Sequence, residues 1–448
     1  MPTAIAKARS IDELRWICRA EALEADMLRS FFVETGAARD PHRNIRDQIR
    51  TTLAGITDAR ILFYGHRGCG KSTELNKLSE ELAAGYAVVK FSVEKEMNMT
   101  QVFTEDLLLV ICEQLLQFAS FSNLHVDPAL LDPVNRFFAE ITTTQTAGRD
   151  AAIAASAGAR AGIPDFLSSL LSIFASLSAD IRTSTSQKET AVSRVRKRPA
   201  DLLHNANSII NAVRDALPKG KRLLVIVEDL DKLDIDTAYP IFVRNVNLLC
   251  GLDTNIIYTI PVFLFFSPDV EAFRSKFDAV FRLPMIKTSE PPDTDVKTGF
   301  DTVRAVVLAR VEQSLIADEA LDLLVRKTGG VLRHIFQALN DVALMTNVPV
   351  PIDAAHIRVA LDSLRAELWK QIALPREDFP GRPQSGDELF KRLADYAREQ
   401  RRGAKPLPKS DGVNQILLRS CVLVEYNGAH WLGVHPLIVE ALEGEHLL

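Results

Sequence analysis

The chain has 448 residues, of which 47% are hydrophobic and 25% charged, with a formal net charge of −5 and an isoelectric point of about 6.0. This composition is typical of a globular protein and excludes collagen-like, disulfide-rich and disordered chains. The length predicts about three domains, and the mild acidity excludes a globally basic nucleic-acid binder while leaving room for local basic patches.

The cysteines and the lengths of the apolar stretches indicate the cellular compartment of the protein. The five cysteines lie far apart and show no metal-ligand spacing, which favours a reducing, cytoplasmic location. The amino terminus lacks the apolar core of a secretory signal. The longest apolar stretches are shorter than a bilayer span, so we expect no membrane span.

The first part of the chain alternates between helical and strand patterns. Residues 10–34 carry apolar side chains at helical spacing and predict one long helix. The apolar run 60–64 predicts a strand before a glycine-rich loop, and the Val- and Phe-rich run 86–93 predicts another. Further helices are predicted at residues 45–53, 74–84, 100–119 and 128–142.

Residues 143–193 differ from their surroundings, because they are rich in Ala, Ser, Thr and Gly. We interpret them as an insertion. The middle, residues 164–181, predicts an amphipathic helix that packs on the body of the protein or on a partner, whereas the two ends favour loops.

Three apolar runs in the second half predict the rest of a sheet. Residues 221–233 and 255–266 are continuous apolar runs, typical of strands buried on both faces of a parallel sheet, and residues 279–286 are a last strand candidate. The alternation of strands with helices predicts an α/β domain, a parallel sheet flanked by helices. The intervening helices are predicted at residues 199–217, 239–250 and 268–277.

The remaining chain changes pattern twice. Residues 298–372 predict helices only. From residue 386 we expect a helix at 387–400, a basic loop, a helix at 413–420 and a β-hairpin whose turn is Asn427-Gly428, a strong hairpin signal.

The stretch from Gly65 to Ser72 fits G-x-x-x-x-G-K-[ST] between the predicted strand and helix. Glycines let such a loop wrap so that its amides face phosphates, and the following helix directs its N-terminal dipole at the same anion. Lys71 would reach the β- and γ-phosphates, and Ser72 would ligate Mg²⁺. The candidate nucleotide-binding residues are Gly65, His66, Arg67, Gly68, Cys69, Gly70, Lys71, Ser72 and Thr73.

A second motif, Glu228-Asp229-Leu230-Asp231, ends a predicted buried strand, at the edge where open α/β sheets bind ligands. One acid would hold Mg²⁺ and another would polarise the attacking water. We assign Glu228 to the metal and Asp229 to the water, with Asp231 in support; which of the first two holds the metal stays open. The usual first acid is Asp, so Glu228 is one methylene longer. The alternative is a solvated acidic turn.

The pair Gly329-Gly330 precedes a predicted helix and puts Arg333 in its first turn. On its own this pattern is equally typical of a helix cap with a surface arginine.

Together, the three motifs resemble those of AAA+ ATPases near the origin-recognition-like and STAND branches of P-loop NTPases, over residues 43–372. The acidic second motif also resembles that of the KAP group. KAP proteins carry membrane segments between the two phosphate motifs, but the insertion here lacks spans of adequate length. The resemblance implies ATP and Mg²⁺ as cofactors, an α/β core followed by a helical lid, and Arg333 as the sensor-2 residue that contacts the γ-phosphate.

The resemblance also implies a polar sensor 1 at the end of the fourth strand and an arginine finger supplied to a neighbouring subunit. Thr259 fits sensor 1 if the strand ends before Pro261, and Ser267 fits if it continues; we favour Thr259. Arg274 is the first candidate for the finger and Arg282 the second, with surface or strand-edge arginines as the alternative.

The C-terminal segment resembles a winged helix. Such modules bind DNA in origin-type ATPases and pack against the ATPase core in STAND-like proteins. A cluster of basic residues in this segment would contact DNA phosphates, and the alternative is a solvated charged loop. A second basic run lies at residues 194–198. The cluster comprises Arg398, Arg401, Arg402, Lys405 and Lys409.

These patterns favour an ATP-binding, slowly hydrolysing AAA+/STAND-like switch that couples nucleotide state to homo-oligomer assembly or to a protein partner. The alternatives are a DNA-binding ATPase of mobile-element or replication-initiator type and a bacterial conflict or defence signalling ATPase. The expected domains are an N-terminal helical segment 1–42, a P-loop core 43–290, a helical lid 291–372 and a winged-helix-like domain 386–448.

Overall fold

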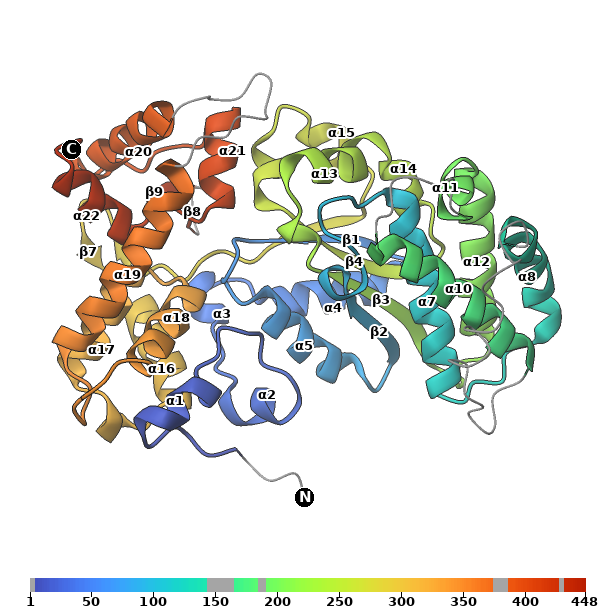
Figure 1. Cartoon of the computed structure of the whole chain (residues 1–448), viewed down its shortest axis with the longest axis horizontal. Helices are drawn as coiled ribbons and strands as arrows, with labels where there is room; N and C mark the ends of the chain where they lie inside the picture. Colours follow the sequence, from blue (N-terminus) through green and yellow to red (C-terminus); the bar gives the residue numbers. More distant parts are fainter. Residues whose placement is uncertain (1–4, 143–164, 184–190, 374–385, 427–430) are drawn as a thin grey trace.

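A computed structural model describes residues 5–142, 165–183, 191–373, 386–426 and 431–448 (Figure 1). Its centre is a parallel five-stranded sheet in the order β2-β3-β4-β1-β5. The predicted α/β fold with a parallel sheet flanked by helices is therefore confirmed. The strands are β1 (Arg60–Tyr64), β2 (Tyr86–Ser92), β3 (Arg222–Glu228), β4 (Asn255–Ile260) and β5 (Ala279–Arg282).

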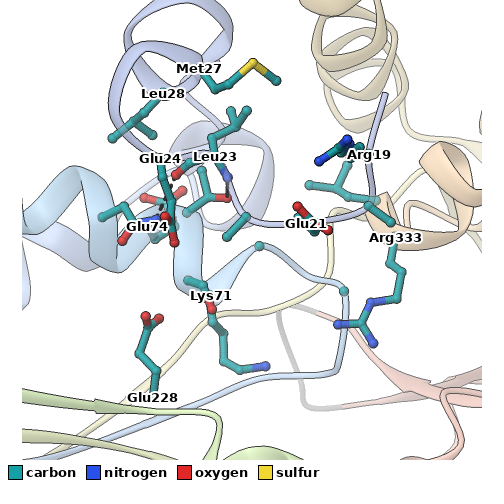
Figure 2. A pocket seen from close by; sticks show the side chains of 18 of the residues that line it. Arg19, Glu21, Leu23, Glu24, Met27, Leu28, Lys71, Glu74, Glu228 and Arg333 are labelled. Carbon is teal, nitrogen blue, oxygen red and sulfur yellow. Dashed lines mark hydrogen bonds between the residues drawn. The ribbon is translucent and has the colours of Figure 1, made fainter. Parts of the chain in front are cut away.

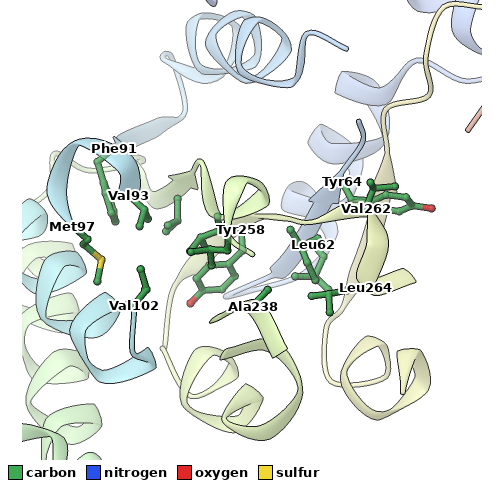
Figure 3. Packing of buried hydrophobic residues seen from close by; sticks show 14 of the residues in the cluster. Leu62, Tyr64, Phe91, Val93, Met97, Val102, Ala238, Tyr258, Val262 and Leu264 are labelled. Carbon is green, nitrogen blue, oxygen red and sulfur yellow. The ribbon is translucent and has the colours of Figure 1, made fainter. Parts of the chain in front are cut away.

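The two faces of the sheet have separate apolar cores because successive side chains along a strand point to opposite faces. Ile61 and Phe63 of β1 pack with α4 (Ile45–Gly55) and α5 (Lys71–Leu82). Leu62 of β1 and Tyr258 of β4 belong to the core of the other face, which Figure 3 shows from close by. Because all strands are parallel, their carboxyl ends meet at one edge, where the phosphate loop follows β1.

Five helices extend the second face into a bundle at the right of Figure 1. The middle of the predicted insertion is α10 (Asp165–Thr183), which packs against α7 and α8, with the rings of Phe138 and Phe174 4.6 Å apart. This helix therefore packs on the body of the protein. The ends of the insertion lie mostly outside the described residues. The other bundle helices are α7 (Thr104–Phe121), α8 (Pro128–Thr142), α11 (Ala191–Arg196) and α12 (Pro199–Asp215).

The predicted all-helical segment consists of four main helices at the left of Figure 1. We call them the lid: α16 (Lys297–Arg310), α17 (Asp318–Thr328), α18 (Leu332–Val342) and α19 (Ala354–Ala373). Short elements complete this part and the core: α3 (Gly36–Arg39), α6 (Val93–Glu96), α15 (Val270–Arg274), β6 (Ser289–Glu290), β7 (Thr294–Asp295) and the 3₁₀ turns Leu230–Lys232, Val262–Phe266 and Gln313–Leu315.

Residues 386–448, here called the C-terminal module, contain the two predicted helices and the predicted hairpin. Strands β8 and β9 pair antiparallel, and the turn predicted at Asn427-Gly428 lies outside the described residues. A third helix was not predicted; Pro436 occupies its first turn and the ring of His435 caps it. The elements are α20 (Gly386–Arg401), α21 (Gly412–Arg419), β8 (Leu423–Glu425), β9 (Leu432–Val434) and α22 (Pro436–Gly444).

The single helix predicted for residues 10–34 is wrong. The structure has α1 (Ile11–Ile17) and α2 (Ala25–Phe31), separated by an irregular segment. The backbone of this segment is bound by distant side chains: Asn340 donates to the carbonyl of Cys18 and Asn76 to that of Leu23, both at 2.8 Å. These tertiary hydrogen bonds replace helical ones, so the apolar periodicity alone was misleading.

Two further predicted elements differ. The helix predicted at 239–250 is divided into α13 (Ile235–Tyr239), a π turn (Pro240–Arg244) and α14 (Val246–Cys250). The apolar run 255–266 is a strand only to Ile260, because Pro261 lacks the amide needed to continue the ladder. Within the described ranges, every helix is too short or too polar to cross a lipid bilayer.

Candidate nucleotide-binding site

The predicted phosphate loop connects β1 to α5, and Lys71 is the first residue of that helix. Gly68 and Gly70 adopt positive φ values of 78° and 99°. A Cβ on Gly68 would lie 2.4 Å from the Cβ of Arg333 in the lid. Glycine at position 68 is therefore required twice, by the backbone conformation and by the close approach of the lid.

The side chain of Lys71 is buried and reaches back to the start of the phosphate loop. Its Nζ donates to the carbonyls of Gly65 at 2.8 Å and His66 at 2.9 Å, and lies 2.9 Å from Oδ2 of Asp231. Burial opposes the charge on both side chains, but their attraction outweighs it, so the pKa of Lys71 is raised and that of Asp231 is lowered. Asp231, expected only in support, is thus the acid paired with the loop lysine.

The carboxylates of Glu228 and Asp229 have separate partners. Oε2 of Glu228 lies 2.7 Å from Nζ of Lys90 on β2. Asp229, with a φ of 67°, accepts a hydrogen bond from the hydroxyl of Ser92, and its Oδ1 lies 2.9 Å from Nζ of Lys232. Each of the three acids of the second motif therefore pairs with a different lysine.

The surroundings of Glu228 fit a magnesium ion. Its Oε1 is buried and has no hydrogen-bond partner among the described residues. Burial raises the pKa of Glu228, and Lys90 and the neighbouring hydroxyl of Ser72 act against that rise. A carboxylate oxygen and a serine hydroxyl at the start of the helix are the ligand types that Mg²⁺ takes in phosphate sites. Ser72 and Glu228 would therefore hold the ion.

A cavity of about 1270 Å³ lies over the loop. It is lined by the phosphate loop, the ends of β2 and β3, residues 16–39 and the lid helices α16 and α18. Figure 2 shows Lys71 and Glu228 on the core side and Arg333 reaching toward the same space from the lid. The volume exceeds that of typical small-ligand pockets, so it accommodates a nucleoside triphosphate.

The irregular segment 18–24 covers this cavity, which the sequence did not indicate (Figure 2). The amide of Leu23 donates to Oγ1 of Thr73 at 3.2 Å, and Asn76 of the same helix donates to the Leu23 carbonyl. Thr73 is one of the predicted nucleotide-binding residues, but in the structure its hydroxyl oxygen accepts a hydrogen bond from the covering segment.

Arg39 is a buried residue of the site that sequence reasoning missed. Its guanidinium donates to the carbonyl of Cys69 in the phosphate loop at 2.6 Å, to Oγ1 of Thr35 at 2.9 Å and to the carbonyl of Pro284. Burial lowers the pKa of Arg39, with nearby acids including Glu74 acting against it. Arg39 thus stabilises the phosphate loop, and residues 35–44, which lie between two predicted helices, contain no sequence motif that indicates this role.

The lid contacts the loop at the predicted sensor-2 position. The amide of Arg333 donates to the carbonyl of Gly68 at 3.3 Å, and its side chain lines the cavity. Among the described residues, no carboxylate forms an ion pair with the Arg333 guanidinium. Beside it, Phe336 also lines the cavity, and its ring lies 3.8 Å from the guanidinium carbon of Arg310.

The predicted sensor-1 and finger residues lie outside the cavity lining. Strand β4 ends before Pro261, the condition under which Thr259 was preferred over Ser267. Oγ1 of Thr259 donates to the carbonyl of Val227 and accepts from the amide of Leu230, both at 3.2 Å, so it braces the turn that carries the acids. Arg274 is exposed on α15, whereas Arg282 lies 2.6 Å from Glu425 of the C-terminal module.

The C-terminal module packs directly against the phosphate loop. The amide of Glu425 in β8 donates to Nε2 of His66 at 2.7 Å, and the thiol of Cys421 lies 3.6 Å from the carbonyl of Arg67. Burial lowers the pKa of His66 to about 4, so the ring is neutral and accepts this hydrogen bond. Arg67 donates to the carbonyl of Lys232. The side chains of His66 and Arg67 therefore bind protein groups.

The basic cluster proposed for DNA is largely paired within the chain. Arg398 lies 3.1 Å from Asp395, Lys405 lies 3.4 Å from Glu290, and Arg401 pairs with Glu443. In the earlier basic run, Arg196 pairs with the buried Asp106. These contacts favour structural roles for most of these cations.

Comparison with known proteins agrees with the site. The model of the KAP family P-loop domain matches residues 44–252, which span the phosphate loop and the second motif, so the predicted resemblance to the KAP group is confirmed. A solved structure of the Orc1 protein of Aeropyrum pernix in complex with DNA aligns over 97% of this chain and 98% of that chain, at 13% identity and a TM-score of 0.39. That likeness is too distant to bear on function. No curated protein matches the sequence. The parallel sheet, the phosphate loop and the second acidic motif together give the chain a P-loop NTPase fold, and its residues 44–252 are similar to the KAP family P-loop domain.

Proposed function

We propose that this protein binds ATP with Mg²⁺ in the cavity between the phosphate loop and the lid, and hydrolyses it slowly. The observation that carries the proposal is the contact of Arg333 with Gly68: a lid arginine without an ion-pair partner in the described structure stands over the phosphate loop, opposite Lys71 (Figure 2). A triphosphate would supply the anion that such an arginine lacks.

Each residue of the site would have a separate role in binding or hydrolysis. Lys71 and the loop amides would bind the β- and γ-phosphates, and Arg333 would bind the γ-phosphate from the lid. Ser72 and Glu228 would hold Mg²⁺, which neutralises phosphate charge. Asp229 would polarise the attacking water. Its carboxylate is already engaged by Ser92 and Lys232, which supports slow turnover.

The contacts of this site with the lid and the C-terminal module would allow bound nucleotide to change how the protein engages others. ATP would hold Arg333 and the lid on the loop, which they already contact, and the loop is in turn bound to the C-terminal module through His66 and Glu425. We propose that nucleotide state thereby controls assembly or the engagement of a protein partner. Arg274 is exposed and would serve a neighbouring subunit in such an assembly.

Titration calorimetry with ATP and Mg²⁺ tests the binding site. Lys71→Ala should abolish measurable binding, because it removes the phosphate-binding cation and leaves Asp231 buried and unpaired. Lys77→Ala, a half-buried lysine of the same helix that pairs with Glu80, is the matched control and should bind as the wild type does. Equal affinity of the Lys71→Ala variant and the wild type would refute the proposal.

Turnover and assembly are tested with Asp229→Asn. The variant should bind ATP normally but release no phosphate, because the amide cannot act as the base. Its molar mass by light scattering should then rise with ATP and persist, whereas the wild type should return to its starting mass as ATP is consumed. Continued phosphate release would show that another acid activates the water, and an unchanged mass with ATP would contradict the assembly role.

A further inference from the structure

Lys90 occupies an unusual position beside the candidate metal ligand. It lies on β2, on the same face as Tyr86 and Val88, which pack under α4 and α5. Its Nζ is 2.7 Å from Oε2 of Glu228 and also donates to Oδ1 of Asn76. Only 23% of the Lys90 side chain and 7% of the Glu228 side chain are exposed, so this ion pair is shielded from solvent.

Two other lysines that line the cavity, Lys71 and Lys232, are paired with other acids of the second motif. Lys71 is held by Asp231 at 2.9 Å, and Lys232 by Asp229 at 2.9 Å. Lys90 is therefore the side chain that balances the charge of Glu228 in this arrangement. A buried carboxylate without such a cation would repel a triphosphate placed on the adjacent loop, and this repulsion is strong where solvent screening is weak.

We propose that Lys90 is the counter-ion that balances the charge of Glu228, an inference that rests on the proposed ATP site. ATP binding to this protein therefore does not depend on Mg²⁺. Lys90 compensates Glu228 through Oε2, while Oε1 is buried and has no hydrogen-bond partner among the described residues. Binding of the nucleotide and loading of the metal are thus separable events at this site. Lys90 acts as a positioning residue, because it holds Glu228 and takes no part in the chemical step.

The first test compares ATP affinity with Mg²⁺ and with EDTA, by fluorescence anisotropy of a labelled ATP analogue. For the wild type we expect dissociation constants within about fivefold of each other, because Lys90 already balances Glu228. This comparison needs no variant. A wild-type affinity that falls by more than this in EDTA would overturn the inference while leaving the proposed ATP site intact.

The second test uses Lys90→Met, which keeps the length of the side chain and removes its charge. Its affinity in EDTA should fall roughly tenfold or more, and Mg²⁺ should restore it, because the ion then balances Glu228. Lys77→Met, at a half-buried lysine of α5 that pairs with Glu80, is the matched control, and it should behave as the wild type does in both buffers. An equal loss in both buffers, or no loss in EDTA, would overturn the inference.

A double variant separates charge balance from packing. In a Glu228→Gln background the carboxylate is neutral, so adding Lys90→Met should no longer weaken binding in EDTA. A loss that persists in that background would mean that Lys90 acts through packing, and the inference would fall. If the wild type bound no ATP in either buffer, the proposed function would fail, and the inference with it.

Discussion

The backbone amide of Arg333 donates a hydrogen bond of 3.3 Å to the carbonyl of Gly68, so the first turn of lid helix α18 rests on the phosphate loop. The two residues are 265 positions apart in a chain of 448 residues. The contact joins the loop that binds phosphate to the helix that carries the candidate γ-phosphate ligand. The lid and the loop therefore cannot move independently while this contact lasts.

Gly68→Ala should disrupt that contact. A methyl group there would lie 2.4 Å from the Cβ of Arg333, at a φ of 78° that L-residues rarely adopt. We expect a loss of roughly 1–3 kcal/mol in unfolding free energy from strain alone, and a further weakening of ATP binding. Denaturant unfolding and calorimetry measure the two effects.

Gly220→Ala is the matched control for backbone strain. Its φ is 86°, but nothing lies within 4 Å of the added Cβ. It should lose stability from strain without losing ATP affinity. If both alanine variants bound ATP as the wild type does, the contact between lid and loop would have no part in nucleotide binding.

Arg333→Ala should weaken ATP binding by roughly tenfold or more, the value of one charge-assisted hydrogen bond to phosphate. Stability should hardly change, because the guanidinium has no ion-pair partner among the described residues. Calorimetry and thermal unfolding separate the two quantities. Arg365→Ala, at a half-buried arginine of lid helix α19 that pairs with Asp362, should alter neither quantity. A large loss of stability without a change in affinity would assign Arg333 a purely structural role.

Arg39→Ala should destabilise the protein by roughly 2–6 kcal/mol, because it leaves the buried carbonyls of Cys69 and Pro284 unpaired, at about 1–3 kcal/mol each. Chemical denaturation of the variant checks this value. The exposed Arg29, on neighbouring α2, should tolerate alanine within about 0.5 kcal/mol. Comparable losses for the two variants would show that the buried hydrogen bonds of Arg39 contribute little.

His66 should make stability depend on pH. Its folded pKa of about 4 lies below the ordinary value of 6.5, so the unfolded state takes up a proton as the pH falls through this window and the folded state does not. The contribution of the neutral His66 ring to the unfolding free energy is therefore fully present above pH 6.5. It falls by about 3 kcal/mol as the pH is lowered to 4. His66→Gln keeps an acceptor for Glu425 but cannot titrate, so its unfolding free energy should fall less steeply. Parallel pH profiles for the two proteins would contradict a neutral, buried His66.

Duplex DNA should bind weakly and with a shallow salt dependence, because Arg398, Arg401 and Lys405 are paired with acids of the same chain. Fluorescence anisotropy across a salt series measures this. A steep salt slope that became shallower in Arg401→Ala would show that the cluster binds phosphate despite its internal pairing.

The sequence predicted the features that depend on local pattern. Continuous apolar runs marked the buried strands, and the glycine spacing from Gly65 to Gly70 marked the phosphate loop, because each constraint lies within a few residues. Glu228 and Asp231 were placed at the correct strand end for the same reason. Their partners Lys90 and Lys71 are 138 and 160 positions away, and nothing in the local pattern assigns one lysine to one acid.

The parts that were missed all depend on distant contacts. Arg39 binds the carbonyl of Pro284 across 245 positions, and His66 binds Glu425 across 359. The irregular segment 18–24 looked helical because its apolar spacing is helical. Its backbone is instead bound by Asn340, 322 positions from Cys18, and by Asn76. Only the folded chain brings these groups together.

Hydrogen exchange with and without ATP and Mg²⁺ tests the central claim most directly, because it reports on the loop and the lid together. In the wild type, ATP should slow amide exchange both in residues 65–73 and in residues 331–336, while Lys71→Ala should show neither effect. Protection of the loop without the lid would contradict a site shared between them. No protection in either segment of the wild type would contradict nucleotide binding at this loop.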